Sequence, residues 1–281
     1  MDQVNLTAWE GRTGHSAGEI STTLATQLHA TLGNPRIAAP SFGDPVPQLW
    51  HWCAFPPLTP TTELGRDGHP GLGHFLPPVQ LERRMWAGGA LRFRAPIRVG
   101  EPLERRSSVR AIKEKVGKSG PMIFVTIDHA IYGSSGLAIE EQQDIAYLPI
   151  PSTYTPPVKR PMPEKPILSA KKAMPETLLF RYSALTFNAH RIHYDLPYAK
   201  DVEHYPGLVV HGPLQATLLL NAAKDHKGRG PDHFHFRGLH PMFAGVDLDI
   251  AAVDEDGALN LMSGQRGHQG MQATAIWEET V

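Results

Sequence analysis

The sequence contains one cysteine, Cys53, and no hydrophobic run of membrane-spanning length. A single cysteine excludes an internal disulfide framework and fits a reducing compartment, and a membrane span needs about 20 apolar residues in a row. The N-terminal residues lack the basic region and apolar core of a signal peptide. We therefore expect a cytoplasmic protein without a membrane segment.

Neither sign of charge is in excess, because 27 Lys and Arg residues balance 28 Asp and Glu residues and leave a net charge of −1. Charge-driven binding to nucleic acid or to an anionic membrane needs a basic excess, so neither partner is expected. Histidine, in contrast, is abundant, and eight of the 15 histidines lie between His190 and His240. This crowding indicates a site, although surface histidines would produce the same count.

Proline marks the predicted division of the chain. Seven prolines between Pro149 and Pro166 favour an extended, semi-rigid segment. We predict that residues 149–172 form a linker between an N-terminal domain, residues 1–148, and a C-terminal domain, residues 173–281.

Two short segments, one in each predicted domain, resemble each other. The segment from Pro96 to Leu103 matches the segment from Pro241 to Leu248, with proline, glycine and leucine each 145 residues apart. Each segment follows a Phe-Arg pair. An offset near half of the chain length indicates duplication of one α+β unit, with chance similarity over eight positions as the alternative.

The expected elements mix helices with antiparallel strands. Leucines spaced four apart predict a helix over 19–32, a proline start predicts a short buried helix over 45–55, and a mostly apolar circumference predicts a buried helix over 214–223. Strand-like runs lie at 90–93, 107–113, 122–132, 259–262 and 271–277. A buried helix wrapped by antiparallel strands is a hot dog. The predicted fold class is therefore an α+β double hot dog, in which two antiparallel sheets each wrap around a central helix.

The stretch 186–215 holds the main candidate residues. A polar loop with Asn188, His190 and His193 is followed by a short apolar strand over 208–210. Imidazoles are suited to acid and base work near neutral pH. The loop therefore indicates proton-transfer chemistry.

A helix start follows this loop directly. Pro213 suits the first helical position, where its missing N–H would be unpaired anyway, and Gly212 then takes the N-cap. A helix N-terminus offers unpaired N–H groups that stabilise a developing oxyanion. Proton transfer is therefore expected beside a carbonyl group.

The run Asn188-x-His190-x-x-His193-x-Asp195, followed by Val210-His211-Gly212, resembles the MaoC-like hydratases and dehydratases. These are hot-dog proteins that act on enoyl and 3-hydroxyacyl thioesters, and their loop usually reads Asp-x-Asn-x-x-His. Asn188 then stands in the aspartate position, His190 in the asparagine position and His193 in the histidine position. Because an amide cannot act as a general base, this departure puts a mechanism with two bases in doubt.

Further segments are similar to one branch of that family, namely 50–52, 64–70, 84–89 and 181–195. The branch contains itaconyl-CoA and mesaconyl-C4-CoA hydratases together with mitochondrial-type 3-hydroxyacyl-thioester dehydratases. Its N-terminal half is a hot dog without a catalytic loop of its own. The resemblance thus implies that the C-terminal half carries the only site.

The roles that follow centre on His193 as the catalytic acid and base. Asn188 holds a water or the thioester region, or is only a turn residue. His190 takes part in the proton transfer or only orients His193. The Gly212 N–H donates a hydrogen bond to the oxyanion. An alternative is that His190, His193 and His211 ligate a metal, but the sequence has no HExxH motif and no cysteine pair, so no metal is expected.

The expected substrate-binding residues are His211, Arg181, Arg191 and Arg237. His211 could instead pack beside Gly212. A guanidinium suits a carboxylate or a CoA phosphate, and the alternative for each arginine is a solvated position on the surface.

The resemblance implies a hydro-lyase that adds water reversibly to an enoyl-CoA thioester. A short branched dicarboxylyl-CoA, itaconyl-CoA or mesaconyl-C4-CoA, is the expected substrate. The alternatives are a 3-hydroxyacyl-thioester dehydratase of fatty-acid synthesis, a hot-dog thioesterase and a non-catalytic acyl-CoA binder. No cofactor is implied, the CoA thioester is a substrate, and a homodimer is a possible assembly.

Overall fold

The computed structural model describes residues 5–33, 35, 37–117 and 120–279. Ten strands and three α-helices account for most of the regular structure of these residues. The N-terminal half contains β1 (Thr13–Gly18), α1 (Thr22–Leu32), β2 (Arg83–Phe93), β3 (Leu103–Gly117), β4 (Gly120–Gly133) and β5 (Gly136–Leu148). The C-terminal half contains β6 (Leu168–Lys172), α2 (Glu176–Leu185), α3 (Gly212–Lys227), β7 (His233–Gly238), β8 (Leu248–Glu255), β9 (Ala258–Gln265) and β10 (His268–Ile276).

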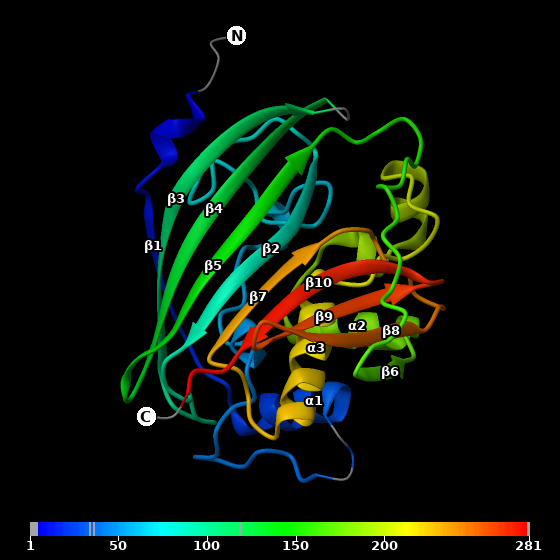
Figure 1. Cartoon of the computed structure of the whole chain (residues 1–281). Coiled ribbons are helices and arrows are strands. Elements are labelled where there is room, and N and C mark those ends of the chain that lie inside the picture. The colour runs from blue at the N-terminus through cyan, green and yellow to red at the C-terminus, as the bar shows by residue number, and fades with distance from the viewer. Residues whose placement is uncertain (1–4, 34, 36, 118–119, 280–281) are drawn as a thin grey trace.

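All ten strands belong to one antiparallel sheet in the order β1-β3-β4-β5-β2-β7-β10-β9-β8-β6 (Figure 1). The second five strands repeat the order of the first five in reverse, so an approximate two-fold axis passes between β2 and β7. The fold is the predicted α+β double hot dog. The expectation of two sheets was wrong, because β2 and β7 pair edge to edge from Gly88↔Arg237 to Arg92↔His233.

Glycine makes this junction possible. A Cβ atom on Gly88 would lie 2.6 Å from the Phe236 carbonyl oxygen, and a Cβ atom on Gly89 would lie 3.1 Å from the Phe236 ring. The distance at Gly88 is too short for a side chain and the distance at Gly89 is tight, so glycine at these two positions allows the halves to approach closely. The halves therefore form a single sheet within one chain.

The duplication is visible in matching loops and hydrogen bonds. The Val46 N–H donates to Ile97 O at 2.8 Å, and the Val210 N–H donates to Met242 O at 2.8 Å. The turn glycines that follow have φ angles of 81° at Gly100 and 79° at Gly245. Pro96 and Pro241 lie in the corresponding β2–β3 and β7–β8 loops. They occupy equivalent positions as predicted, although in loops rather than on strands.

The two halves differ most in their central helix. In the C-terminal half α3 has 16 residues, is buried from Leu214 to Leu220 and ends at Lys227, followed by the C-cap Gly228 with a left-handed φ of 81°. The segment that follows Val46 in the N-terminal half forms only a 3₁₀ turn, Trp50–Cys53. The helix predicted over 45–55 was therefore wrong, because Pro45 and Pro47 leave few backbone donors.

Other elements also begin or end at different residues from those predicted. Helix α1 begins at Thr22 rather than Glu19, because the Ser21 side chain accepts from the Leu24 N–H and caps it. The strand predicted over 208–210 is reduced to one bridge, Val209↔Phe243. Strand β6, at 168–172, lies inside the range predicted as a linker.

In Figure 1 the three helices lie together on one side of the C-terminal strands. No helix among the described residues is long and apolar enough to span a bilayer.

Candidate active site

The loop with the predicted catalytic residues begins where α2 ends. Phe187 adopts a left-handed φ of 51°, which turns the chain out of the helix. The Asn188 N–H then donates to Ser183 O at 2.8 Å, and the Asn188 Oδ1 accepts from the His190 N–H at 3.0 Å. The 3₁₀ turn Arg191–His193 follows directly. Asn188 therefore shapes the turn, and it also lines the cavity described below.

His193 is buried and held in one orientation. Its Nδ1–H donates to Val209 O at 2.7 Å, so the lone pair of the neutral ring resides on Nε2. Burial and the neighbouring imidazoles of His211 and His190 lower the pKa of His193 well below its usual value. At neutral pH the side chain is thus an uncharged base that accepts a proton through Nε2.

His211 packs against the His193 ring. The two rings stack with centroids 3.6 Å apart, and His211 Nε2 lies 2.8 Å from Ser183 Oγ. Complete burial, reinforced by His190, lowers the pKa of His211 to about 3. Because the ring is fully covered, a packing and orienting role fits the geometry better than the predicted substrate contact.

His190 lies beside the buried carboxylate of Glu203, a residue that the sequence patterns did not indicate. His190 Nε2 lies 3.4 Å from Glu203 Oε1. The other oxygen of Glu203 accepts from Arg83 Nε at 3.2 Å, and Arg83 also donates to the Glu203 carbonyl at 2.5 Å. Glu203 is 1% exposed. Arg83 belongs to β2, so this ion pair ties the N-terminal half to the loop.

The N-terminus of α3 lies beside the histidines. His211 is the N-cap, Gly212 the first helical residue and Pro213 the second. The helix therefore begins one residue earlier than predicted. The N–H groups of Gly212 and Leu214 have no acceptor within the helix. A Cβ atom on Gly212 would lie 3.7 Å from the Trp86 carbonyl oxygen, which places this helix start against β2.

A cavity of about 680 Å³ opens in front of the loop. Both halves contribute to its wall. The C-terminal half provides Tyr182, Ser183, Phe187, Asn188 and Pro213, and the N-terminal half provides His51, Trp52, Phe55, His69, Arg84, Trp86 and Arg105. The cavity therefore lies between the two hot dogs and reaches the start of α3.

The arginines in this wall are not the predicted ones. Arg237 projects from β7 as an exposed side chain, and Arg181 is exposed on α2 beside a different hollow. Arg191 is bound to Asp195, with Nη2 2.7 Å from Oδ2. The geometry instead brings Arg84 and Arg105 to the cavity. The arginine of the 84–89 segment could have been proposed from sequence, because that segment was already part of the resemblance.

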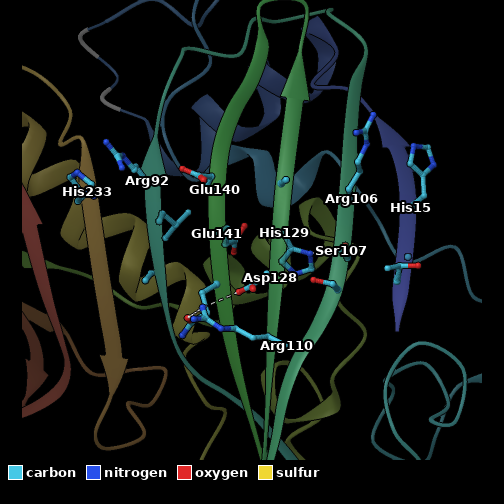
Figure 2. Close-up of a pocket in the computed structure, with 17 residues that line it drawn as sticks. His15, Arg92, Arg106, Ser107, Arg110, Asp128, His129, Glu140, Glu141 and His233 are labelled. Carbon is cyan, nitrogen blue, oxygen red and sulfur yellow. Dashed lines mark hydrogen bonds and ion pairs between the residues drawn. The ribbon is translucent and has the colours of Figure 1, made fainter. Parts of the chain in front are cut away.

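A second hollow, of about 970 Å³, is lined by strands β1 to β5 and β7 (Figure 2). Its charged side chains are largely compensated. Arg110 donates to Gln142 at 3.0 Å and lies 3.5 Å from Asp128. His129 and Ser107, labelled in Figure 2, are hydrogen-bonded to each other at 2.7 Å. The histidine loop does not contribute to this hollow, so we place the chemistry in the first cavity.

One group of side chains has the spacing of metal ligands. Ligand atoms of Asp67, His69 and His190 lie within 4.8 Å of one another. However, Asp67 Oδ2 and His69 Nδ1 are 2.8 Å apart and already form a hydrogen bond. The three residues therefore also fit a hydrogen-bonded network of carboxylate and imidazoles without any ion.

Comparisons with known proteins identify the family. The family model of hydroxyacyl-thioester dehydratase type 2 matches residues 49–244. A mesaconyl-C(4)-CoA hydratase from Chloroflexus aurantiacus is 43% identical over 276 residues, which cover 93% of this chain and 97% of that protein. A solved MaoC-like dehydratase has a TM-score of 0.71 at 13% identity and covers 97% of this chain and 100% of its own. A Mycobacterium tuberculosis protein with a double hot-dog fold has a TM-score of 0.56 at 15% identity, over 95% and 96% of the two chains. The chain belongs to the family of type 2 hydroxyacyl-thioester dehydratases.

Proposed function

We propose that this hydro-lyase adds water reversibly across the α,β double bond of an enoyl-CoA thioester. One observation supports this most directly. His193 is a neutral imidazole whose Nδ1–H is fixed on Val209 O, which leaves Nε2 as a proton acceptor beside the start of α3. A base next to a helix N-terminus suits water addition beside a carbonyl group.

The reaction follows from these parts. The thioester carbonyl binds at the α3 N-terminus, where the Gly212 N–H stabilises the oxyanion. His193 Nε2 removes a proton from water while the oxygen forms a bond to the β-carbon and the π electrons move onto the thioester oxygen. The protonated His193 then delivers the proton to the α-carbon as the carbonyl re-forms. One residue that performs both steps adds water to one face of the double bond.

The substrate is proposed to be a short branched dicarboxylyl-CoA such as mesaconyl-C4-CoA. In this thioester the β-carbon, which water attacks, also bears a methyl group and a carboxylate. A buried carboxylate needs a cation, and here the cation must lie close to the histidines. Arg84 fits, because it is half-buried, lines the cavity and lies near enough to His69 to lower the pKa of that imidazole.

Arg84 is also available for a ligand. It makes no ion pair or hydrogen bond with the residues that the structure describes, whereas its neighbour Arg83 is committed to Glu203. Arg105 provides a second positive charge in the wall, and its Cζ lies 4.8 Å from the centre of the Phe55 ring. A fatty acyl thioester would instead require an apolar end to the cavity. The two arginines favour the dicarboxylyl substrate over the fatty acyl alternative.

A panel of thioesters tests the proposal. Mesaconyl-C4-CoA and itaconyl-CoA are compared with crotonyl-CoA and a medium-chain enoyl-CoA, by loss of enoyl absorbance and by release of free thiol. Hydration with higher kcat/KM on the dicarboxylyl substrates supports the proposal. Preference for the uncharged chains indicates a dehydratase of fatty-acid synthesis. Thiol release indicates a thioesterase, and binding without either change indicates an acyl-CoA binder.

Arg84→Met sharpens the substrate assignment. We expect kcat/KM for mesaconyl-C4-CoA to fall roughly 10²-fold, as for removal of one charge-assisted contact, while crotonyl-CoA is affected less than about threefold. Arg94→Met is the matched control, because Arg94 pairs with Glu140 at the surface, away from the cavity. An equal effect of Arg84→Met on both substrates would show that Arg84 does not bind the acyl carboxylate.

A homodimer and a cytoplasmic location are also proposed. The ten-stranded sheet already joins two hot dogs within one chain, and a homodimer would add a further interface. Light scattering coupled to gel filtration distinguishes a monomer of 30.9 kDa from a dimer. A cytoplasmic location accords with the single, buried and unpaired Cys53.

A further inference from the structure

A loop of the N-terminal half packs directly against the catalytic loop. The Arg191 N–H donates to Asp67 O at 2.9 Å, and Arg191 Nη1 donates to Arg66 O at 3.1 Å. Gly68 lies so close to Ala189 that a Cβ atom would overlap the Ala189 carbonyl oxygen. The segment 66–69 is therefore held in place by the same residues that shape the catalytic loop.

This segment presents an oriented imidazole to the cavity. Asp67 holds His69 twice, because Oδ1 accepts from the His69 backbone N–H at 3.0 Å and Oδ2 accepts from the ring Nδ1–H at 2.8 Å. The lone pair of the neutral ring is then on Nε2. His69 lines the cavity, and its ring centroid lies 4.2 Å from that of His190. The His190 ring centroid in turn lies 5.3 Å from that of His193.

Burial and hydrogen bonding keep Asp67 ionised and His69 uncharged at neutral pH. Burial, together with the neighbouring His190 and Arg84 side chains, lowers the pKa of His69 to about 3. Burial alone would raise the pKa of Asp67, but the hydrogen bonds from His69 outweigh it and the net pKa falls well below its usual range. At neutral pH the pair is a carboxylate and an uncharged imidazole, so Nε2 accepts hydrogen bonds.

Water addition needs such an acceptor. Attacking water has two hydrogens, and both must be accepted while one oxygen lone pair points at the β-carbon. In the catalytic loop, His193 Nε2 accepts one of them. Asn188 is a weaker second acceptor than a carboxylate, because one of the two lone pairs of its Oδ1 is used by the His190 N–H and its nitrogen only donates. The other hydrogen of the water is therefore held better by an uncharged imidazole outside the loop than by this amide.

We propose that His69 is a second catalytic residue, whose Nε2 accepts the other hydrogen of the attacking water, and that Asp67 is its positioning residue. The inference rests on the proposed function. One O–H bond of water breaks to His193 and an O–C bond forms at the β-carbon. The second O–H bond persists, hydrogen-bonded to His69, and becomes the hydroxyl of the product. The proton on His193 passes to the α-carbon, so no proton is gained or lost overall. The site is then assembled from both halves of the chain.

Substitutions of His69 test its role as an acceptor. We expect His69→Ala to lower kcat on the best thioester substrate roughly 10²- to 10³-fold, with KM within about threefold. In His69→Gln the amide oxygen reaches the region of Nε2, so this variant should retain at least about tenfold more activity than His69→Ala. His74→Ala is the control, because His74 is exposed on the same loop. Circular dichroism and thermal unfolding establish that each variant is folded.

Asp67→Asn tests the positioning role. The asparagine amide can donate to Nδ1, which moves the ring proton to Nε2 and converts the acceptor into a donor. Nitrogen-15 NMR of the histidine side chains should therefore show His69 Nε2 without a proton in the wild type and with a proton in Asp67→Asn. The kcat of Asp67→Asn should fall as far as that of His69→Ala, whereas a purely structural Asp67 would leave the tautomer unchanged.

The outcomes separate this inference from the proposed function. If the wild type hydrates no enoyl thioester, the proposed function and the role of His69 both fail. If the wild type is active and His69→Ala matches His74→Ala, only the role of His69 fails. Loss of wild-type activity in EDTA with recovery in added Zn²⁺ would make Asp67, His69 and His190 metal ligands and would also overturn the acceptor role. Loss in His69→Ala, partial retention in His69→Gln and insensitivity to EDTA support it.

Discussion

The imidazole rings of His193 and His211 are stacked, with centroids 3.6 Å apart and planes inclined by 18°. Both rings are buried. Two charged imidazoles cannot share this space, because their repulsion would add to the loss of hydration. The stack therefore favours the neutral form of His193, which is the form that accepts a proton from water.

The first prediction concerns His193 itself. His193→Ala should lower kcat roughly 10²- to 10⁴-fold, the usual contribution of a positioned acid or base. The exposed His226, near the end of α3, provides a control in His226→Gln, for which no loss is expected. Steady-state kinetics on the best enoyl-CoA substrate measure both variants. A folded His193→Ala protein with near wild-type turnover would remove His193 from the mechanism.

The second prediction concerns stability in acid. His69, His193 and His211 have lowered pKa values in the folded protein, whereas unfolded histidines titrate near about 6.5. Below that pH the unfolded chain binds more protons than the folded chain. The stabilising contribution is therefore complete above about pH 6.5 and decreases as the pH falls towards about 3, by up to about 1.4 kcal/mol per pH unit for each group.

Urea unfolding at pH 7.5, 6.5 and 5.5 measures this effect. We expect equal stability at the two higher values to within about 1 kcal/mol and a clear decrease at pH 5.5. The His226→Gln variant should follow the same curve, because His226 is exposed and lies outside the buried histidine cluster. Equal free energies of unfolding at pH 7.5 and 5.5 would contradict the assignment of neutral, buried imidazoles.

Much of the fold could be predicted from local patterns. The apolar circumference of residues 214–223 predicted the buried α3, and the repeat at Pro96 and Pro241 predicted equivalent positions in the two halves, which the structure places in loops rather than on strands. The single sheet could not be predicted, because edge-to-edge pairing of β2 with β7 depends on contacts between residues about 150 positions apart. Short elements such as the Trp50–Cys53 turn also depend on packing rather than on intrinsic propensity.

Candidate site residues could be grouped from sequence only where they lie close together along the chain. Asn188, His190 and His193 form one loop and could be identified as a group. Glu203 and Arg83 are 120 positions apart and give no local pattern. Arg181 and Arg191 were proposed because they flank the loop in sequence, and Arg237 because it precedes the repeated segment at Pro241. The cavity is instead completed by the N-terminal half, so the arginines that line it lie far from the loop in sequence.

The third prediction concerns the ion pair that joins the halves. Arg83→Met leaves the Glu203 carboxylate, which is 1% exposed, without its cation. We expect a loss of roughly 3–5 kcal/mol in the free energy of unfolding, as for breaking a buried pair. Removing both charges in Arg83→Met/Glu203→Gln should cost less than Arg83→Met alone. Arg94→Met breaks an exposed pair and should cost less than about 1 kcal/mol. A smaller effect of Arg83→Met than of Arg94→Met would contradict the buried pair.

The last prediction uses a glycine to move one half of the site without removing any ionisable group. Gly68 has a φ of 90° and lies against the Ala189 carbonyl, with which a new Cβ atom would overlap. Gly68→Ala must therefore shift either the loop that carries Asp67 and His69 or the loop that carries the catalytic histidines.

If both halves contribute to the site, Gly68→Ala should lower kcat at least about tenfold, since small displacements of reacting groups are costly. Gly43→Ala is the matched control, because Gly43 has a φ of 82° and a Cβ atom added there would meet no other atom within 4 Å. That control carries the cost of a left-handed alanine, about 1–2 kcal/mol, without the steric overlap. If the two variants lose similar stability but only Gly68→Ala loses turnover, the contact between the halves is required for catalysis. Full activity in Gly68→Ala would show that the N-terminal loop is not needed at the reacting atoms.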